Sequence, residues 1–393
     1  MLRIHKNNVV VFFIIILLIS GCKSGNDKAS STPTPTPTIP QNPREFRIDT
    51  IASFNDPWAL TELSDGRLLV TEKAGVLKLF NPQDGGVTQI NGVPDVVDMG
   101  QGGLGDIKLH PNFDQNKLIY LSYVERDPSN SQLYGAVVIR AQLDMTNSKA
   151  SLSNIQRIWT QVPKFFGVGH YAYRILFDEH GKLWISSGER QEFFPAQDMN
   201  SNAGKILRLN DDGSLPSDNP FQNQGEIAKQ VWSLGHRNAL GMAFDQQQKL
   251  WVAEMGPAGG DEFNLITRAG NYGYPIVSEG FHYPSDSFRT PFLRHTERPE
   301  FIAPVMSWTR VISPSSLIFY KGSLFPQFKN KAIMGGLSSR GLVIVDIENR
   351  PVREIARISM NSRIRAITES KDGTLWILKD AMRQDNLLRL VPR

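Results

Sequence analysis

One strand–turn–strand pattern recurs along the chain, and this recurrence limits the fold more than any other feature of the sequence. Each copy joins two apolar, β-rich stretches through a turn-forming corner such as Asp65-Gly66, His180-Gly181 or Gln248-Lys249. Such corners between alternating apolar and polar runs are typical of antiparallel strands. The six copies are residues 59–72, 106–124, 174–190, 241–256, 316–337 and 366–380.

A single copy is too small to bury its own apolar face, so the copies are expected to stack on one another. Radial stacking predicts an all-β, six-bladed β-propeller, in which the uneven spacing of the copies places long loops on one face. A β-sandwich is the alternative, although six similar units fit it poorly. The sequence shows no long amphipathic helix that would favour a mixed fold.

The N-terminus predicts export. Residues 1–21 combine a basic start with an apolar run shorter than the about 20 residues that a spanning helix needs, so they resemble a signal peptide. Cys22 follows in "ISGC", which resembles the lipobox of bacterial lipoproteins. It is the only cysteine of the chain, and a lone cysteine in an exported protein is explained by lipidation rather than by a disulfide. An uncleaved anchor helix is the alternative.

Residues 22–45 are polar and then alternate Thr with Pro, which predicts a disordered tether behind the lipidated Cys22. The propeller is therefore expected over residues 46–393. This organisation places it on the periplasmic face of a bacterial membrane or on the cell surface. The outer membrane is favoured because Lys23, not Asp, follows the lipidated cysteine.

The net charge of the chain is small, at +4, and no basic cluster is interleaved with aromatic residues. Nucleic acid is therefore not an expected partner.

Several loops carry residues that could do chemistry, yet each motif alone also has a structural interpretation. His170 lies between glycines and aromatic residues, where a histidine is either a base or a buried structural group. The glycine-rich "GQGGLG" at 100–105 lacks the strand–loop–helix context of a dinucleotide site. The stretch 256–262, "GPAGGDE", is either a plain turn or a source of oxygen ligands for Ca²⁺.

Taken in order, these motifs resemble the soluble pyrroloquinoline-quinone (PQQ)-dependent aldose sugar dehydrogenases, relatives of soluble quinoprotein glucose dehydrogenase. The resemblance runs from about Phe46 to the C-terminus. The motifs that carry it are "QGGLGDIKLHPNF" (101–113), "GHYAYRILFDEHGKLWISSGER" (169–190), "AQDMNSNAGKILRLNDDGSLPSDNPF" (196–221), "VWSLGHRNALGMAFD" (231–245), "EMGPAGGDEFNLI" (254–266), "NYGYP" (271–275) and "SRIRAI" (362–367).

The resemblance implies a PQQ-dependent oxidation of aldoses to lactones. His170 matches the family's catalytic base, which takes the proton of the anomeric hydroxyl while hydride passes from sugar C1 to the quinone. Arg237 would stabilise the charge that develops on the reduced cofactor. The family's cofactor-contacting positions are matched by Gln101, His170, Arg237, Asn238, Arg363 and Arg365.

The resemblance also implies Ca²⁺. Gly256 and Pro257 match the pair whose main-chain carbonyls hold a calcium ion against the quinone. Glu262 and Tyr272 match the oxygen ligands of a second, structural calcium site.

Several positions depart from the family pattern, among them the stretch 308–320, "WTRVISPSSLIFY", which is a loose version of the family's Ser-Gly loop. Tyr173 stands where the family has Gly or Ser, and Ala258 stands where arginine is frequent. The stretch 335–342, "GGLSSRGL", supplies no lysine where the glucose dehydrogenases have one. A non-catalytic propeller that binds carbohydrate or protein, or a Ca²⁺-dependent lactonase, therefore remains an alternative function. The sugar, the electron acceptor and the choice between monomer and homodimer stay open.

Overall fold

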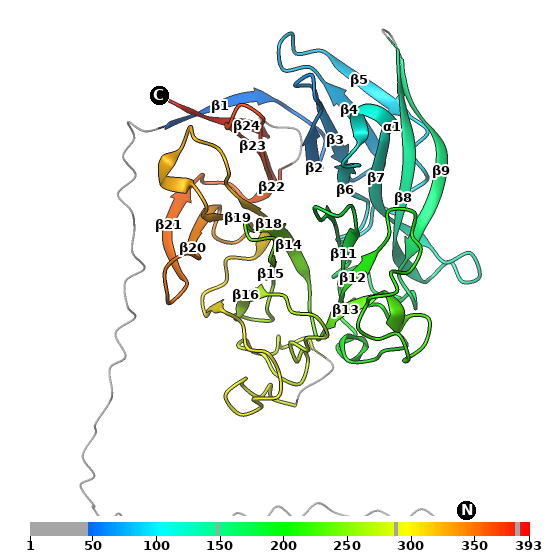
Figure 1. Cartoon of the computed structure of the whole chain (residues 1–393), viewed down its shortest axis with the longest axis vertical. Coiled ribbons are helices and arrows are strands. Elements are labelled where there is room, and N and C mark those ends of the chain that lie inside the picture. Colours follow the sequence, from blue (N-terminus) through cyan, green and yellow to red (C-terminus); the bar gives the residue numbers. More distant parts are fainter. Residues whose placement is uncertain (1–45, 147–148, 287–289, 382–385) are drawn as a thin grey trace, which may run out of the picture. The chain divides into compact units, whose positions relative to one another are not determined.

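The computed structural model describes residues 46–146, 149–286, 290–381 and 386–393 (Figure 1). The predicted signal peptide, Cys22 and the tether lie outside these residues. Strands dominate the described part, so the predicted all-β class is confirmed. Its helical pieces have three or four residues each: α1 (Phe113–Asn116), η1 (Phe194–Ala196), η2 (Ala228–Gln230) and η3 (Pro326–Phe328).

The strands form antiparallel groups of four. Three groups are separate sheets made of consecutive strands. Two further groups join into one eight-stranded sheet through a short parallel pairing of β5 with β9. The bounds are β2 (Pro57–Glu62), β3 (Leu68–Glu72), β4 (Val76–Phe80), β5 (Val87–Asn91), β6 (Leu104–Leu109), β7 (Leu118–Arg126), β8 (Tyr134–Met145), β9 (Ala150–Thr160), β10 (Ala172–Phe177), β11 (Leu183–Ser187), β12 (Lys205–Leu209), β13 (Val231–Leu234), β14 (Ala239–Phe244), β15 (Leu250–Glu254), β16 (Asp261–Leu265), β17 (Met306–Trp308), β18 (Pro314–Phe319), β19 (Ala332–Gly336), β20 (Gly341–Asp346) and β21 (Arg353–Ser359).

The remaining sheet joins the two ends of the described chain. Its order is β1 (Phe46–Ala52), β24 (Leu387–Pro392), β23 (Leu375–Lys379) and β22 (Ile364–Glu369). Strand β1 is antiparallel to β24, and Phe46 pairs with Pro392. The first described strand therefore completes a sheet whose other strands come last in the sequence.

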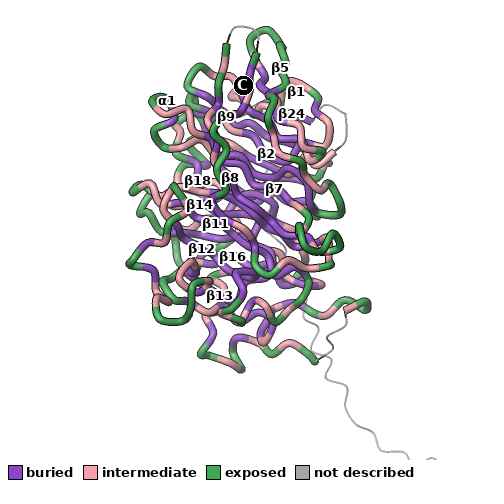
Figure 2. The backbone as a smooth tube through the Cα atoms, turned by 90° about the vertical axis from the view of Figure 1, so that its right-hand side faces the viewer, coloured by how far each residue is buried: buried purple, intermediate pink, exposed green. Residues whose placement is uncertain are grey.

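The first strands of the groups surround a common centre. Each first strand contacts the next one: β2 contacts β6, β6 contacts β10, β10 contacts β14, β14 contacts β18, and β18 contacts β22. Strand β22 in turn contacts β2, which closes the ring. Because each group presents its first strand to this centre, loops from several groups meet at the ends of the ring. Figure 2 shows buried residues concentrated along the inner strands and exposed residues along the outer turns.

The corners predicted from the sequence are tight turns. In the turn between β10 and β11, Asp178 accepts a hydrogen bond from the main chain of Gly181, whose φ of +74° suits glycine. The corresponding corner between β14 and β15 uses Gln248 at a φ of +58°. The local sequence thus sets the hairpins, while the apolar strand faces set their stacking.

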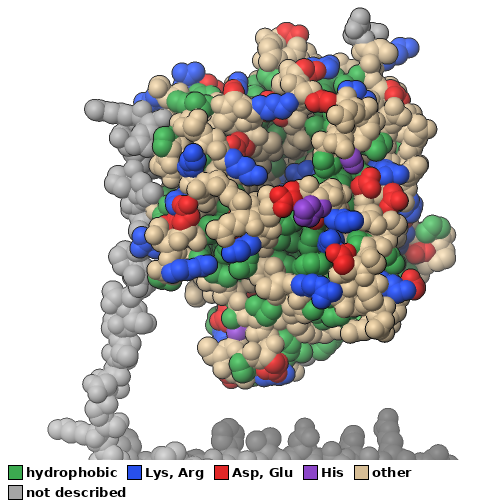
Figure 3. All heavy atoms as spheres, viewed as in Figure 1, with side chains coloured by type: hydrophobic (Ala, Val, Ile, Leu, Met, Phe, Trp, Pro, Cys, Tyr) green, Lys and Arg blue, Asp and Glu red, His purple; other side chains and the backbone are tan. Residues whose placement is uncertain are grey.

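Lys and Arg side chains are interspersed with Asp and Glu side chains on the face drawn in Figure 3. None of the helices in the described ranges has the length and apolar character needed to cross a membrane.

Candidate active site

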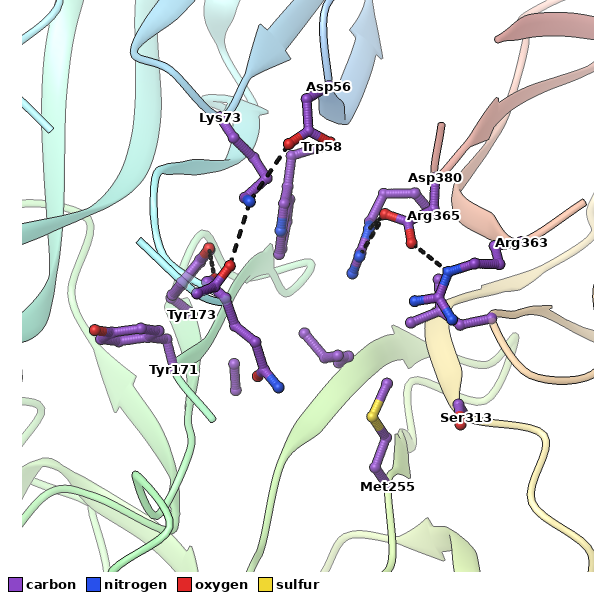
Figure 4. A pocket seen from close by; sticks show the side chains of 15 residues that line it. Asp56, Trp58, Lys73, Tyr171, Tyr173, Met255, Ser313, Arg363, Arg365 and Asp380 are labelled. Carbon is purple, nitrogen blue, oxygen red and sulfur yellow. Dashed lines mark hydrogen bonds and ion pairs between the residues drawn. The ribbon is translucent and has the colours of Figure 1, made fainter. Parts of the chain in front are cut away.

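A cavity of about 380 Å³ lies where the inner ends of several strand groups meet (Figure 4). Ligand sites usually occupy cavities of this order. The sequence prediction that loops from separate repeats converge is therefore confirmed. The lining residues are Asp56, Trp58, Lys73, Gly100, Gln101, Tyr171, Ala172, Tyr173, Leu240, Met255, Ser313, Leu337, Arg363, Arg365 and Asp380.

Two arginines on one wall of the cavity share a single carboxylate. Arg363 Nε donates to Asp380 Oδ2 at 2.6 Å, and Arg365 donates to Asp380 Oδ1 from Nε at 3.0 Å and Nη2 at 2.6 Å. Burial raises the pKa of Asp380, but the two guanidinium groups outweigh it and lower the pKa. Because two cations face one anion, this wall keeps a surplus positive charge and unused N–H donors. Such a wall is suited to a ligand that bears carboxylates.

Gln101 and Tyr173 connect the loops on the opposite wall. The main-chain N–H of His170 donates to Gln101 Oε1 at 2.9 Å, and the Tyr173 hydroxyl donates to the Gln101 carbonyl at 3.0 Å. The loop before β6 and the start of β10 therefore hold each other in place.

His170 is buried and is oriented by a buried carboxylate. Its Nδ1 lies 2.5 Å from Oε1 of Glu189, whose Oε2 accepts a hydrogen bond from the main chain of Phe193 at 2.9 Å. Burial, followed by the positive charge of Arg237, lowers the pKa of His170 and outweighs the effect of Glu189. The imidazole is therefore neutral at pH 7, and its contact with Glu189 assigns the proton to Nδ1.

A second buried histidine shows the contrast. His236 uses both ring nitrogens, with Nδ1 2.9 Å from Glu254 and Nε2 2.8 Å from the Ser233 hydroxyl. His170 uses only Nδ1, and within the described residues its Nε2 has no hydrogen-bond partner. His236 is thus a satisfied structural histidine, whereas His170 keeps a lone pair for chemistry.

Arg237 and Asn238 reach the same region from the turn before β14. Arg237 Nη1 donates to the carbonyls of Gly256 at 2.8 Å and Met255 at 3.1 Å. Although burial opposes its charge, Tyr274 and Glu189 raise the pKa of Arg237. Among the described residues, Arg237 Nε and Asn238 Oδ1 are buried polar atoms without a partner. Unsatisfied buried atoms of this kind are costly unless a ligand meets them.

A sequence model described as glucose/sorbosone dehydrogenase matches residues 54–389. The chain belongs to this family. It is 34% identical to aldose sugar dehydrogenase YliI of Escherichia coli over 348 residues, which is 86% of this chain and 91% of the relative. Membership makes the chain an oxidoreductase of the sugar dehydrogenase type.

Solved structures of sugar dehydrogenases agree with this assignment. The apo-form of the soluble aldose sugar dehydrogenase from Escherichia coli superposes with a TM-score of 0.79 at 32% identity and covers 88% of this chain and all of its own. A PQQ-bound aldose sugar dehydrogenase from Streptomyces coelicolor has a TM-score of 0.71 at 26% identity and covers 89% of this chain and 99% of its own.

The family-matched residues do not all line the cavity. Gln101, Arg363 and Arg365 line it. The main-chain N–H of His170 donates to Gln101, and the side chains of Arg237 and Asn238 donate to Met255. These three residues therefore lie beside residues that line the cavity. The four positions matched to calcium sites, Gly256, Pro257, Glu262 and Tyr272, lie outside the lining.

The loop matched to the first calcium site is fixed by Asp261. Its Oδ1 accepts from the main chain of Gly256 at 3.0 Å, and its Oδ2 accepts from the main chains of Ile312 and Ser313 at 2.7 Å each. Asp261 thereby joins this loop to the segment before β18, and the Gly256 carbonyl accepts from Arg237.

The surroundings of Glu262 are strongly acidic. Burial raises the pKa of Glu262 well above its ordinary value, and the neighbouring Glu254 adds to the rise. The Tyr272 carbonyl accepts from His295 Nε2 at 3.2 Å, and the Tyr272 hydroxyl donates to Leu265 at 2.6 Å. In the described ranges, no three or more His, Cys, Asp and Glu side chains are grouped to hold a metal ion. A cation bound here would nevertheless stabilise the charged form of Glu262, which burial and Glu254 disfavour.

Tyr173, which departs from the family pattern, is accommodated in the wall of the cavity. Its ring stacks on Trp58 with centroids 5.0 Å apart. A Cβ atom at position 105 would lie 1.9 Å from Tyr173 Cε2, so the ring uses space that exists because residue 105 is glycine. Tyr173 therefore narrows the site from one side and leaves the 380 Å³ cavity beside it.

The residues of the site that the sequence prediction did not assign include Glu189, Asp380 and Lys73. Glu189 lies within a quoted motif, and a carboxylate just after the strand that pairs with the start of β10 is the signal that could have found it. Lys73 Nζ lies 3.4 Å from Asp56 and 3.3 Å from Asp98 at the cavity rim.

Proposed function

We propose that this protein is a PQQ-dependent dehydrogenase that oxidises aldoses to lactones. The observation that carries the proposal is the neutral His170, held through Nδ1 by Glu189, beside a cavity lined by Arg363 and Arg365. Family membership and the likeness to a PQQ-bound structure support the same activity.

The cofactor fits the residues that are present. PQQ is a planar quinone with three carboxylates, and Arg363 and Arg365 have N–H donors beyond those that Asp380 uses. The orphaned Nε–H of Arg237 would find an acceptor on its quinone side. When bound, PQQ supplies the two-electron acceptor for the hydrogen on sugar C1.

His170 acts as the general base. Its Nε2 takes the proton of the anomeric hydroxyl as the C1–O bond becomes a carbonyl, and Glu189 stabilises the imidazolium through Nδ1. Arg237 keeps its charge throughout and offsets the negative charge that develops opposite it.

Calcium is part of the proposal. Gly256 and Pro257 would offer main-chain carbonyls to one Ca²⁺, which requires Arg237 to release the Gly256 carbonyl. Glu262 and the Tyr272 carbonyl would hold a second ion, which removes the repulsion between Glu262 and Glu254.

We further propose that the strand groups are the blades of a six-bladed propeller, supported by the closed ring of first strands. The lipid on Cys22 and the tether 22–45 would hold this propeller at the periplasmic face of the outer membrane or at the cell surface. Replacing Cys22 by Ala should move the protein from the membrane fraction to the soluble fraction.

Reconstitution tests the activity. Purified protein is titrated with PQQ in the presence of Ca²⁺ and assayed on a panel of aldoses with a dye as electron acceptor. We expect one PQQ per chain and turnover that His170→Ala abolishes while PQQ still binds. A chain that neither binds PQQ nor oxidises any aldose would refute the proposal. Glycan binding that survives His170→Ala would then support a non-catalytic propeller, and lactone hydrolysis with Ca²⁺ alone would support a lactonase.

A further inference from the structure

Arg174 has a role that its position in the ring of first strands suggests. It is on β10, one residue before the regular pairing with β11 resumes at Ile175, and it is 7% exposed. Its guanidinium points to the centre of the ring, where it meets groups from other strands.

The contacts of Arg174 extend to each of the other first strands. Nε donates to the Leu240 carbonyl of β14 at 2.8 Å. Nη2 donates to the Ser315 carbonyl of β18 at 2.5 Å and to the Arg365 carbonyl of β22 at 3.3 Å. Nη1 lies 3.3 Å from Asp106 of β6, and the guanidinium carbon lies 4.0 Å from the ring centre of Trp58 on β2. One side chain from β10 thus joins β2, β6, β14, β18 and β22.

The partners of Arg174 place it beneath the cavity of the candidate active site. Trp58, Leu240 and Arg365 all line that cavity. Arg174 itself lines a second cavity of about 120 Å³, together with Asp106 and Leu240. Leu240 belongs to both linings, so the layer that Arg174 holds together borders both cavities.

The groups around the Arg174 guanidinium form a layer whose arrangement is fixed by hydrogen bonds. A buried guanidinium must be met by acceptors, and here three carbonyls, one carboxylate and an aromatic face meet it. Asp106 is fixed in turn, because its carboxylate also accepts from the main chains of Ile107 at 3.0 Å and Ile175 at 2.9 Å.

We propose that Arg174 is a positioning residue for the cofactor site, which it serves by fixing the floor of the cavity. The proposal rests on the proposed PQQ-dependent function. Arg174 fixes the position of the Trp58 indole and, through the Arg365 carbonyl, the position of strand β22. The Arg365 side chain would then meet a cofactor carboxylate with its N–H donors aligned. It does not touch the cofactor or the sugar.

The test compares Arg174→Lys, Arg174→Ala and the control Arg208→Ala. Arg208 is also buried, ion-paired and within 5.2 Å of a tryptophan ring, that of Trp232, but it lies on β12 away from the cavity. Lysine keeps the buried charge next to Asp106 but cannot donate to three carbonyls in a fixed plane. PQQ affinity is measured by absorbance titration, and main-chain hydrogen exchange is measured without PQQ.

We expect Arg174→Lys to remain folded, to exchange faster over residues 362–367, and to raise the Kd for PQQ by about tenfold. Millimolar methylguanidinium should restore PQQ binding to Arg174→Ala and should not affect Arg208→Ala. Unchanged exchange and an unchanged Kd in Arg174→Lys would overturn the proposal, even if Arg174→Ala fails to fold. If the unmodified chain does not bind PQQ, the proposed function fails, whereas the exchange experiment still decides whether Arg174 fixes the floor.

Discussion

Nδ1 of His170 and Oε1 of Glu189 are 2.5 Å apart, and both side chains are buried. Because the carboxylate holds the proton on Nδ1, the pair presents Nε2 as the acceptor. This relationship turns a histidine that the sequence left between two roles into the best candidate for the base.

Glu189→Gln should lower kcat strongly. The amide can present either its N–H or its carbonyl to Nδ1, so the tautomer is no longer fixed and the imidazolium loses its counter-charge. We expect a loss of about 10²-fold or more in kcat with little change in the Kd for PQQ. Steady-state assays and PQQ titration measure the two quantities. Glu179→Gln, on an exposed turn, is the control, and equal losses in both variants would contradict the role of Glu189.

The pH dependence should reflect the lowered pKa of His170. The unprotonated form of His170 persists below pH 6.5, the ordinary histidine pKa being about 6.5. The midpoint of the acid limb of kcat/KM should therefore lie at a pH below about 6.5. The unfolded chain binds a proton more readily than the native His170. The contribution of His170 to stability is therefore complete above about pH 6.5 and is lost as the pH falls. An acid limb centred above pH 7 would argue against His170 as the titrating group.

Gly105→Ala should destabilise the protein through Tyr173. The new methyl group would overlap the Tyr173 ring, which is fixed between Trp58 and the Gln101 carbonyl. We expect a loss of about 1–3 kcal/mol in the free energy of unfolding. Tyr173→Ser alone should cost about 3 kcal/mol because it leaves a cavity. The double variant should lose less unfolding free energy than the two single variants lose together, because the new methyl group no longer meets the ring. Strictly additive losses in denaturant unfolding would contradict the contact.

Arg363 and Arg365 should contribute separately to cofactor affinity. Each change to Met removes one guanidinium from the wall and leaves Asp380 with a single partner. We expect the Kd for PQQ to rise about tenfold or more in each variant, and the affinity of the unmodified chain to fall with salt. Arg67→Met, which removes an arginine paired with Asp65, is the control and should bind PQQ normally.

Calcium should stabilise the protein through Glu262. Without the ion, the raised pKa of Glu262 means that its contribution to stability is complete at low pH and is lost as the pH rises through its folded value. Ca²⁺ should therefore raise Tm most at neutral pH and release protons on binding. The Ca²⁺-dependent rise in Tm should be smaller in Glu262→Gln than in the unmodified chain. A Ca²⁺-dependent shift of equal size in the variant would place the ion elsewhere.

The hairpins could be predicted from the sequence because their signals are local. The alternation of apolar residues and the corners at Asp178–Gly181 and Asp245–Gln248 lie within one repeat. Stacking of the repeats followed from the lack of a self-sufficient core. The convergence of Gln101, Arg363 and Arg365 on one cavity also followed, once loops of separate repeats were expected to meet.

The rest depended on contacts between distant segments. The accommodation of Tyr173 requires the absence of a side chain at Gly105, and the contacts of Arg174 require the register of every first strand. The pairing of both wall arginines with Asp380 depends on how β22 and β23 align. None of these relationships has a spacing within the sequence that would indicate it.

The pairing of Phe46 with Pro392 has a consequence for how the ring could be reopened. A closed ring whose two ends are neighbours has no privileged starting point. Residues 392 and 46 could be joined by a short linker and the chain cut at an outer turn such as Gly85, where a Cβ atom would meet no other atom within 4 Å. Such a circular permutant would keep every strand pairing while moving the chain ends to a different sheet. The order in which the strands are synthesised is thus separable from the architecture that they form.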